Sequence, residues 1–260
     1  MTWPAAWSKR SPVPDEYLGA SAITLWVIAA GVIFFAKRRG FFIYPTTPPA
    51  TVSFFACLGA FIIYLGLTAL LLYWNRGVPA LMALSAVGVL GFTFWQRDLW
   101  QSFWGKEGIV LGFKALIVVF PFVYAIMQSL EWGLNHWMGE APLEQMIVQI
   151  LKQKRHFFQY AFLAVIVAPI VEELLFRGYL YGWLRGFFNP LRSNGITAFI
   201  FSVFHLSPQY QWHNVQLGGC LFVLALCLGW VRERGGSLVA PIALHMSFNL
   251  ISVVVILCST

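Results

Sequence analysis

Charged side chains are scarce in this chain of 260 residues, since aspartate, glutamate, lysine and arginine make up only 10% of it, against about 25% in an average soluble domain. The acidic types are the scarcest, with 10 residues against 17 basic ones and a formal net charge of +7 at pH 7. Hydrophobic residues make up 59% of the chain. This balance excludes a soluble globular domain and a disordered chain, and it predicts an integral membrane protein. Nucleic-acid binding is the weaker interpretation of the positive charge, because basic residues also gather beside membrane spans.

Cysteine is scarce as well, and no short paired spacing joins the residues that are present. The four cysteines lie scattered through apolar stretches, at Cys57, Cys220, Cys227 and Cys258. This pattern is typical of small packing residues and not of disulfides or metal ligands. The chain also lacks internal repeats, low-complexity segments and the HExxH pattern of a zinc protease helix. We therefore predict no cofactor, with a metal site kept as an alternative below.

Apolar stretches of membrane-spanning character recur along the whole chain, taking about 20 residues for a full crossing. They cover residues 18–36, 51–74, 78–95, 109–130, 157–181, 195–207, 216–231 and 238–258. We therefore predict an all-α fold, a polytopic membrane helix bundle of about eight transmembrane helices. The stretch at 195–207 is short, about 18 Å long as a helix, and Pro208 follows it, so whether it crosses completely stays open.

The spans divide into two groups around a polar connection. Residues 1–140 are predicted to hold the N-terminal transmembrane helices, 141–156 an amphipathic helix on the membrane surface, and 157–260 the membrane core with the candidate site. The basic triplet at residues 37–39 directly follows the first span. Because basic residues favour the cytoplasmic side, this end is expected in the cytoplasm and the amino terminus outside.

Three short motifs place ionisable residues inside the apolar stretches of the core. They are the EExxxR motif of Glu172, Glu173 and Arg177, the FxxxH motif of Phe201 and His205, and the HxxxN motif of His245 and Asn249. A charge at the centre of an isolated span costs about 2.5–3.5 kcal/mol on insertion scales, so the motifs predict a buried functional site. Counted along each predicted span, Glu172, His205, His245 and Asn249 lie about 10–16 Å below the same cytoplasmic face.

Helix geometry separates the roles of the two glutamates. Glu173 and Arg177 are four residues apart and share a helix face, which predicts a local ion pair that offsets the burial of both charges. Glu172 points about 100° away from Glu173 and stays available for chemistry. Because burial strengthens a carboxylate as a base, Glu172 is the best general-base candidate in the chain.

The two histidines are interpreted beside Glu172. A lone His205 on an apolar helix is often only a hydrogen bond between helices, but its predicted depth matches that of Glu172 and favours a functional role. His245 and Asn249 share a helix face and can both donate hydrogen bonds to a developing oxyanion. Polar packing between helices is the alternative interpretation of that pair.

Together the motifs EExxxR, FxxxH and HxxxN resemble the CAAX prenyl protease and bacteriocin-processing family, also called the abortive-infection family, which includes the type II CAAX prenyl endopeptidases. The resemblance implies a glutamic intramembrane protease that needs no metal. It implies that Glu172 and His205 activate the attacking water, that His245 and Asn249 stabilise the oxyanion, and that Glu173 and Arg177 shape the site. The first four spans carry none of the motifs.

The expected function is hydrolysis of a peptide bond of a substrate at the membrane boundary, in a site open to the cytoplasm, with a bacterial cytoplasmic membrane as the expected location. One alternative is a non-catalytic membrane scaffold or bacteriocin immunity factor. Another is a metal-dependent membrane protease, because Glu172, His205 and His245 are of the types that zinc accepts. The lipid bilayer and a peptide or protein substrate are the expected partners, and the sequence carries no signal for substrate identity or oligomeric state.

Overall fold

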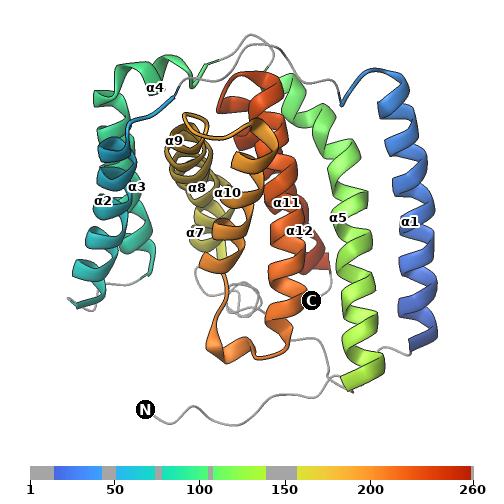
Figure 1. Cartoon of the computed structure of the whole chain (residues 1–260). Helices are drawn as coiled ribbons and strands as arrows, with labels where there is room; N and C mark the ends of the chain where they lie inside the picture. The colour runs from blue at the N-terminus through green and yellow to red at the C-terminus, as the bar shows by residue number, and fades with distance from the viewer. Residues whose placement is uncertain (1–14, 43–50, 74–77, 105–107, 139–156, 259–260) are drawn as a thin grey trace.

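The computed structural model describes residues 15–42, 51–73, 78–104, 108–138 and 157–258, and all regular secondary structure within these ranges is helical (Figure 1). The predicted all-α fold is thereby confirmed. The elements are α1 (Asp15–Arg38), α2 (Phe54–Tyr73), α3 (Val78–Trp95), α4 (Arg97–Gln101), α5 (Gly108–Met138), α7 (Phe157–Phe162), η1 (Leu163–Val167), α8 (Ala168–Glu173), η2 (Leu174–Leu180), α9 (Tyr181–Leu184), α10 (Pro190–Phe204), η3 (Pro208–Tyr210), α11 (His213–Gly235) and α12 (Val239–Cys258).

Each predicted span contains a helix, and four of the helices are long and apolar enough to cross a membrane. These four cover residues 19–38, 108–137, 157–184 and 213–235, and shorter apolar helices cover 54–70, 82–95 and 239–255. The predicted amphipathic helix at 141–156 lies outside the described residues. Together the helices are those of a polytopic integral membrane protein.

The bounds predicted for the short sixth span, 195–207, differ from the observed ones. Helix α10 begins earlier, at Pro190, because the Asn189 side chain accepts a hydrogen bond from the backbone N–H of Arg192 at 2.9 Å and caps the helix. Proline is favoured at a first helical position, where its missing N–H has no partner to lose. The helix ends at Phe204, so His205 lies at its C-cap and not inside it.

The rod formed by residues 157–184 is not a uniform α-helix. Two π-helical segments, η1 and η2, flank the six residues of α8, and the backbone N–H of Ala168 accordingly bonds to the carbonyl of Leu163, five residues back. Each π segment widens the turn and changes the direction of the side chains that follow it. Both glutamates of the first motif lie at the end of α8, directly before η2.

The helix ends that carry most of the basic residues lie together at one end of the bundle, uppermost in Figure 1. Hydrogen bonds join these ends. Arg234 at the end of α11 donates to the carbonyl of Gly40 after α1 at 3.1 Å, and the N–H of Val239 at the start of α12 donates to the carbonyl of Phe103 after α4 at 3.2 Å. The same end also holds Arg185, near the end of α9.

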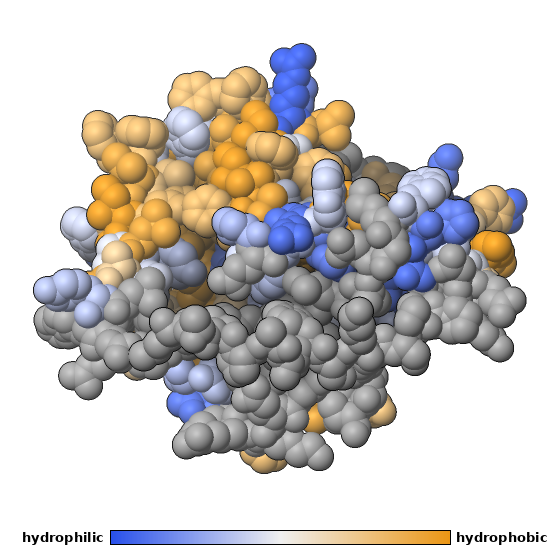
Figure 2. Space-filling model, turned by 90° about the horizontal axis from the view of Figure 1, so that it is seen from below, coloured by the Kyte–Doolittle hydropathy of each residue, from blue (hydrophilic) through white to orange (hydrophobic). Residues whose placement is uncertain are grey.

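The core lies where the rod of 157–184 packs against α2, α3, α10 and α12. A second cluster joins α5, α11 and α12. Many large hydrophobic side chains of α2 remain exposed, among them Phe55 at 80%. Figure 2, which views the opposite end, shows hydrophobic residues gathered on the side of α2 and α3. An exposed apolar surface of this kind is what a helix that faces lipid requires.

Candidate active site

The innermost part of the site is a buried network around Glu173. Its carboxylate and the Arg177 guanidinium are fully buried, and Arg177 Nη1 donates to Glu173 Oε1 at 2.9 Å, as the spacing predicts. Arg177 also donates through Nη2 to the carbonyl of Ala225 in α11 at 3.0 Å and lies 4.7 Å above the ring of Phe201 in α10. These contacts join three helices and hold the Glu173 carboxylate in place.

His245 lies on the other side of Glu173. Its Nδ1 is 2.9 Å from Glu173 Oε1, and the residue is only 4% exposed. Because an ionised carboxylate can only accept, the proton of this hydrogen bond is on Nδ1, and Nε2 is left facing Glu172. The link between His245 and Glu173 was not predicted from the sequence, because the two residues lie 72 positions apart.

Glu172 stands between the two histidines. Its Oε1 is 3.8 Å from His205 Nε2, and its Oε2 is 3.7 Å from His245 Nε2. The structure thus brings together three of the four residues whose common depth was predicted. Both separations exceed a direct hydrogen bond, and groups at such distances can share a water molecule or a polar atom of a substrate.

The orientation of His205 is set by its own helix. Its Nδ1 is 2.8 Å from the carbonyl of Phe201, and since a carbonyl can only accept, Nδ1 carries a proton. In the neutral imidazole Nε2 is then an acceptor, and it faces Glu172. The Phe201 ring lies beside the imidazole, with the ring centroids 4.5 Å apart. The His205 side chain is 32% exposed and that of Glu172 23%, against 5% for His245. His205 and Glu172 are therefore the accessible members of the group.

Asn249 has a different environment from the one expected. Its Nδ2 donates to the backbone carbonyl of Ala164 in η1 at 2.9 Å. The carboxamide therefore ties α12 to the π-helical segment, while His245, one turn earlier, is directed at the two glutamates. The shared face predicted for this pair does not give the two side chains a common hydrogen-bonding partner among the described residues.

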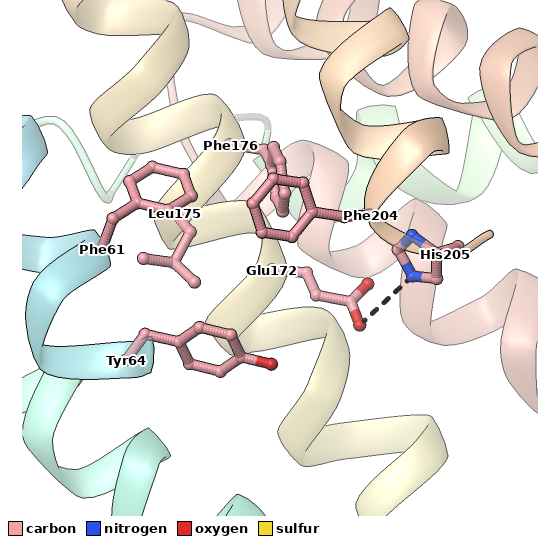
Figure 3. A pocket seen from close by; sticks show the side chains of 7 residues that line it. All are labelled: Phe61, Tyr64, Glu172, Leu175, Phe176, Phe204 and His205. Atoms are coloured by element: carbon pink, nitrogen blue, oxygen red, sulfur yellow. Dashed lines mark ion pairs between the residues drawn. The ribbon is translucent and has the colours of Figure 1, made fainter. Parts of the chain in front are cut away.

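A cavity of about 220 Å³ adjoins Glu172 and His205. Figure 3 shows that apolar and aromatic side chains form most of its wall. It is lined by Phe61, Tyr64, Glu172, Leu175, Phe176, Phe204 and His205. Phe61 and Tyr64 belong to α2, which carries none of the three motifs. They were not predicted, and their only sequence signal is a spacing of three residues, which puts them on one helix face.

Glu172, His205 and His245 meet although they lie at different distances from the ends of their helices. Counted from the observed ends, Glu172 lies about 18 Å from Leu184, His205 about 22 Å from Pro190 and His245 about 9 Å from Val239. These observed ends differ from the span ends predicted from the sequence. The residues meet because α12 begins deeper in the bundle, where Leu238 is fully buried.

A metal site was one of the alternatives. Within the described ranges, no group of three histidine, cysteine, aspartate or glutamate side chains has an arrangement that could hold a metal ion. His245 Nδ1 is engaged by Glu173, and His205 Nδ1 by a backbone carbonyl. Only the Nε2 atoms face Glu172.

Comparisons with known proteins address the same part of the chain. Residues 154–251 match the family model described as "Type II CAAX prenyl endopeptidase Rce1-like". The chain is 25% identical over 168 residues to UPF0177 protein YxdF of Lactococcus lactis subsp. lactis (strain IL1403), covering 63% of this chain and 82% of that protein. It is 26% identical over 132 residues to an uncharacterized 24.3 kDa protein of Escherichia coli, covering 51% of this chain and 57% of that one.

No solved structure matches the chain significantly. The family match spans all three motifs, from Glu172 to Asn249, together with the whole network around Glu173. It leaves out α2, which supplies one wall of the cavity. Residues 154–251 of this integral membrane protein therefore resemble the Rce1-like domain of the type II CAAX prenyl endopeptidases, which are proteases.

Proposed function

We propose that this protein is an intramembrane endopeptidase in which Glu172 and His205 activate a water molecule for attack on a peptide bond. One observation carries the proposal. The Glu172 carboxylate and the Nε2 of His205, which is an acceptor in the neutral imidazole, face each other across 3.8 Å at the edge of an apolar cavity. A water held by both groups has two acceptors for its protons, and the cavity offers room for the side chain next to the scissile bond.

The chemistry then follows in two steps. Glu172 takes a proton from the water as the oxygen attacks the substrate carbonyl, which becomes a tetrahedral oxyanion. The protonated Glu172 then gives the proton to the leaving amine as the C–N bond breaks, and the products are an amine and a carboxylic acid, which loses its proton to the solvent. General base catalysis of this kind contributes about 10²–10⁴-fold in rate. His205 shares the water and orients it.

His245 and Asn249 are assigned to the oxyanion in this proposal. Glu173 accepts the Nδ1 proton of His245 and holds the imidazole with its Nε2 toward Glu172, next to the developing negative charge. Asn249 donates one N–H of its carboxamide to the carbonyl of Ala164, and its second N–H can donate to the oxyanion. Glu173 and Arg177 shape the site by holding His245 in place.

The substrate class follows from the site's size and place. A cavity of about 150 Å³ is enough for a benzene ring, so a cavity of about 220 Å³ accepts a single large apolar side chain. The substrate is a peptide or protein at the membrane boundary, CAAX-type or a peptide precursor. The relatives named above come from bacteria, and basic helix ends favour the cytoplasm. The site would then open to the cytoplasmic side of a bacterial cytoplasmic membrane.

The test uses the purified full chain with two synthetic peptides, a prenylated CAAX peptide and its unmodified twin, and with a membrane proteome searched for new termini. Glu172→Gln and His205→Ala should each abolish the cleavage that the wild type shows, while the variants stay folded. Glu131→Gln is the matched control, because Glu131 is a partly buried carboxylate elsewhere, 3.5 Å from Gln216, and its loss should leave cleavage intact. Proteolysis by Glu172→Gln at the wild-type rate would reject the proposal.

A chelator separates this mechanism from a metal-dependent one. Cleavage by the metal-depleted protein should equal that of the untreated protein. Loss of cleavage in chelator, with recovery on addition of zinc, would favour the metal-dependent alternative.

A further inference from the structure

Tyr64 of α2 lies on the cavity wall formed by the N-terminal half of the chain, and its hydroxyl points toward the Glu172 carboxylate (Figure 3). We infer that this hydroxyl is a further catalytic group, which donates a hydrogen bond to the substrate carbonyl oxygen as that oxygen becomes an oxyanion. The inference rests on the proposed function of the same site. It goes beyond the three motifs, because Tyr64 precedes the segment that matches the family model.

The position of Tyr64 is fixed by contacts between α2 and the rod that carries Glu172. The N–H of Val52, just before α2, donates to the carbonyl of Gly182 at 3.3 Å, and the ring of Phe54 lies 5.5 Å from that of Trp183. One turn before Tyr64, the Phe61 ring makes an edge contact with Phe176 of η2, with the centroids 5.8 Å apart. These contacts hold the phenol against the cavity.

Further along α2, a polar contact fixes the helix to its other neighbour. The Thr68 hydroxyl is 3.2 Å from the Ser85 hydroxyl of α3, in the turn that follows Tyr64. A group that must meet a transition state has to be held before the reaction, since preorganised donors need no reorganisation during it. The α2 contacts on both sides of Tyr64 provide that rigidity.

The Tyr64 hydroxyl has no hydrogen-bonding partner among the described residues, although a half-buried tyrosine usually finds a partner for its O–H. Glu172 in the same cavity can only accept when ionised, and Nε2 of a neutral His205 is an acceptor because the proton is on Nδ1. Tyr64 is thus the hydrogen-bond donor among the side chains that line the cavity.

The other proposed oxyanion donors lie away from this wall. His245 is buried and does not line the cavity, and one N–H of Asn249 is spent on the backbone. In this inference, the oxygen of a carbonyl attacked by the activated water lies on the α2 side of the cavity, where the Tyr64 hydroxyl meets it. The proton stays on Tyr64 throughout, so the hydroxyl stabilises charge and transfers nothing.

Tyr64→Phe tests the inference, because it removes the hydroxyl and keeps the ring in the wall. The expected result is a fall in kcat of about 10²–10³-fold, as for the loss of one oxyanion donor, with KM little changed. Tyr73→Phe is the matched control, since Tyr73 lies on the same helix at 85% exposure, and its cleavage should equal that of the wild type. The probes are the two peptides and the membrane proteome described above.

A binding measurement gives a second readout that does not need turnover. A phosphinic peptide, whose tetrahedral oxyanion imitates the transition state, should bind Tyr64→Phe more weakly by the same factor as the loss in kcat/KM, while an uncleaved peptide binds equally well. A wild-type kcat in Tyr64→Phe, or a change in KM alone, overturns the inference. If Glu172→Gln cleaves like the wild type, the proposed function itself falls. If only Glu172→Gln is inactive, the function stands and the role of Tyr64 falls.

Discussion

Glu172 and Glu173 have different environments because successive residues of a helix point in directions about 100° apart. Glu173 is turned into the core, where it binds Arg177 and His245 at 2.9 Å each. Glu172 is turned toward the cavity, lies more than 3.5 Å from both histidines and keeps 23% of its side chain exposed. The first is a structural acid that orients an imidazole, and the second is left for chemistry.

The buried pair of Glu173 and Arg177 predicts a clear effect on stability. Glu173→Ala leaves the fully buried Arg177 without its carboxylate, so the free energy of unfolding should fall by about 3–5 kcal/mol. Glu172→Ala, which removes a partly exposed carboxylate, should cost much less. Unfolding of the purified proteins in detergent measures both. Equal stability of the two variants would contradict the structural role given to Glu173.

At this scale the sequence predicts local relations well and distant ones poorly. The pairing of Glu173 with Arg177 and the contact of Phe201 with His205 follow from a spacing of four residues. The bond between Glu173 and His245 joins residues that are far apart in the chain, and no local pattern marks it. Tyr64 is one of nine tyrosines and lies in an apolar stretch typical of a transmembrane helix, so nothing in the sequence marks it as a site residue.

Among the elements, the rod of residues 157–184 departs most from what periodicity predicts. A pattern of apolar residues shows that a helix is present, but it does not show the π segments η1 and η2. Asn249 bonds to the carbonyl of Ala164 within η1, and Arg177 of η2 reaches Ala225 in α11. The π segments therefore lie where other helices contact the site.

Close packing of α5 against α12 supports the position of His245. At Gly112 an added methyl group would meet the Ala240 carbonyl oxygen at 2.6 Å and the Ala243 side chain at 2.7 Å. Gly112→Ala should therefore push the helices apart and lower the free energy of unfolding by about 1–3 kcal/mol. Cleavage should also fall, because the displaced segment of α12 directly precedes His245.

Gly91→Ala is the control for this prediction, since nothing lies within 4 Å of the methyl group it adds. It should leave stability unchanged or raise it slightly, because alanine favours a helix interior. Thermal unfolding of both variants in detergent is the measurement. A Gly112→Ala protein as stable and active as Gly91→Ala would show that this contact does not support the site.

Across the whole molecule, the presence of a helix in each apolar stretch is the best predicted feature. Each apolar stretch holds a helix, because the bilayer leaves the backbone little choice other than internal hydrogen bonds. The way the helices meet was predicted only for the motif-bearing ones. That α2 closes one side of the cavity depends on side-chain packing between apolar surfaces, and hydrophobicity alone does not specify such packing.

The predicted orientation can be tested with single cysteines in a protein whose own cysteines are replaced. Arg192→Cys, at the exposed start of α10, should react with a membrane-impermeant thiol reagent only from the cytoplasmic side. Trp137→Cys, at the opposite end of α5 and 78% exposed, should react only from outside. Labelling of both from one side, or with the sides exchanged, would refute the orientation.

The central claim is that Glu172 acts as a base on water and does not attack the peptide itself. Cleavage by the wild-type protein in heavy-oxygen water, followed by mass spectrometry of product and enzyme after a single turnover, tests it most directly. The account predicts that the new carboxylate of the product contains the heavy oxygen and that Glu172 contains none. Heavy oxygen in the Glu172 side chain, with an unlabelled product, would mean that Glu172 attacked the carbonyl and would contradict the account.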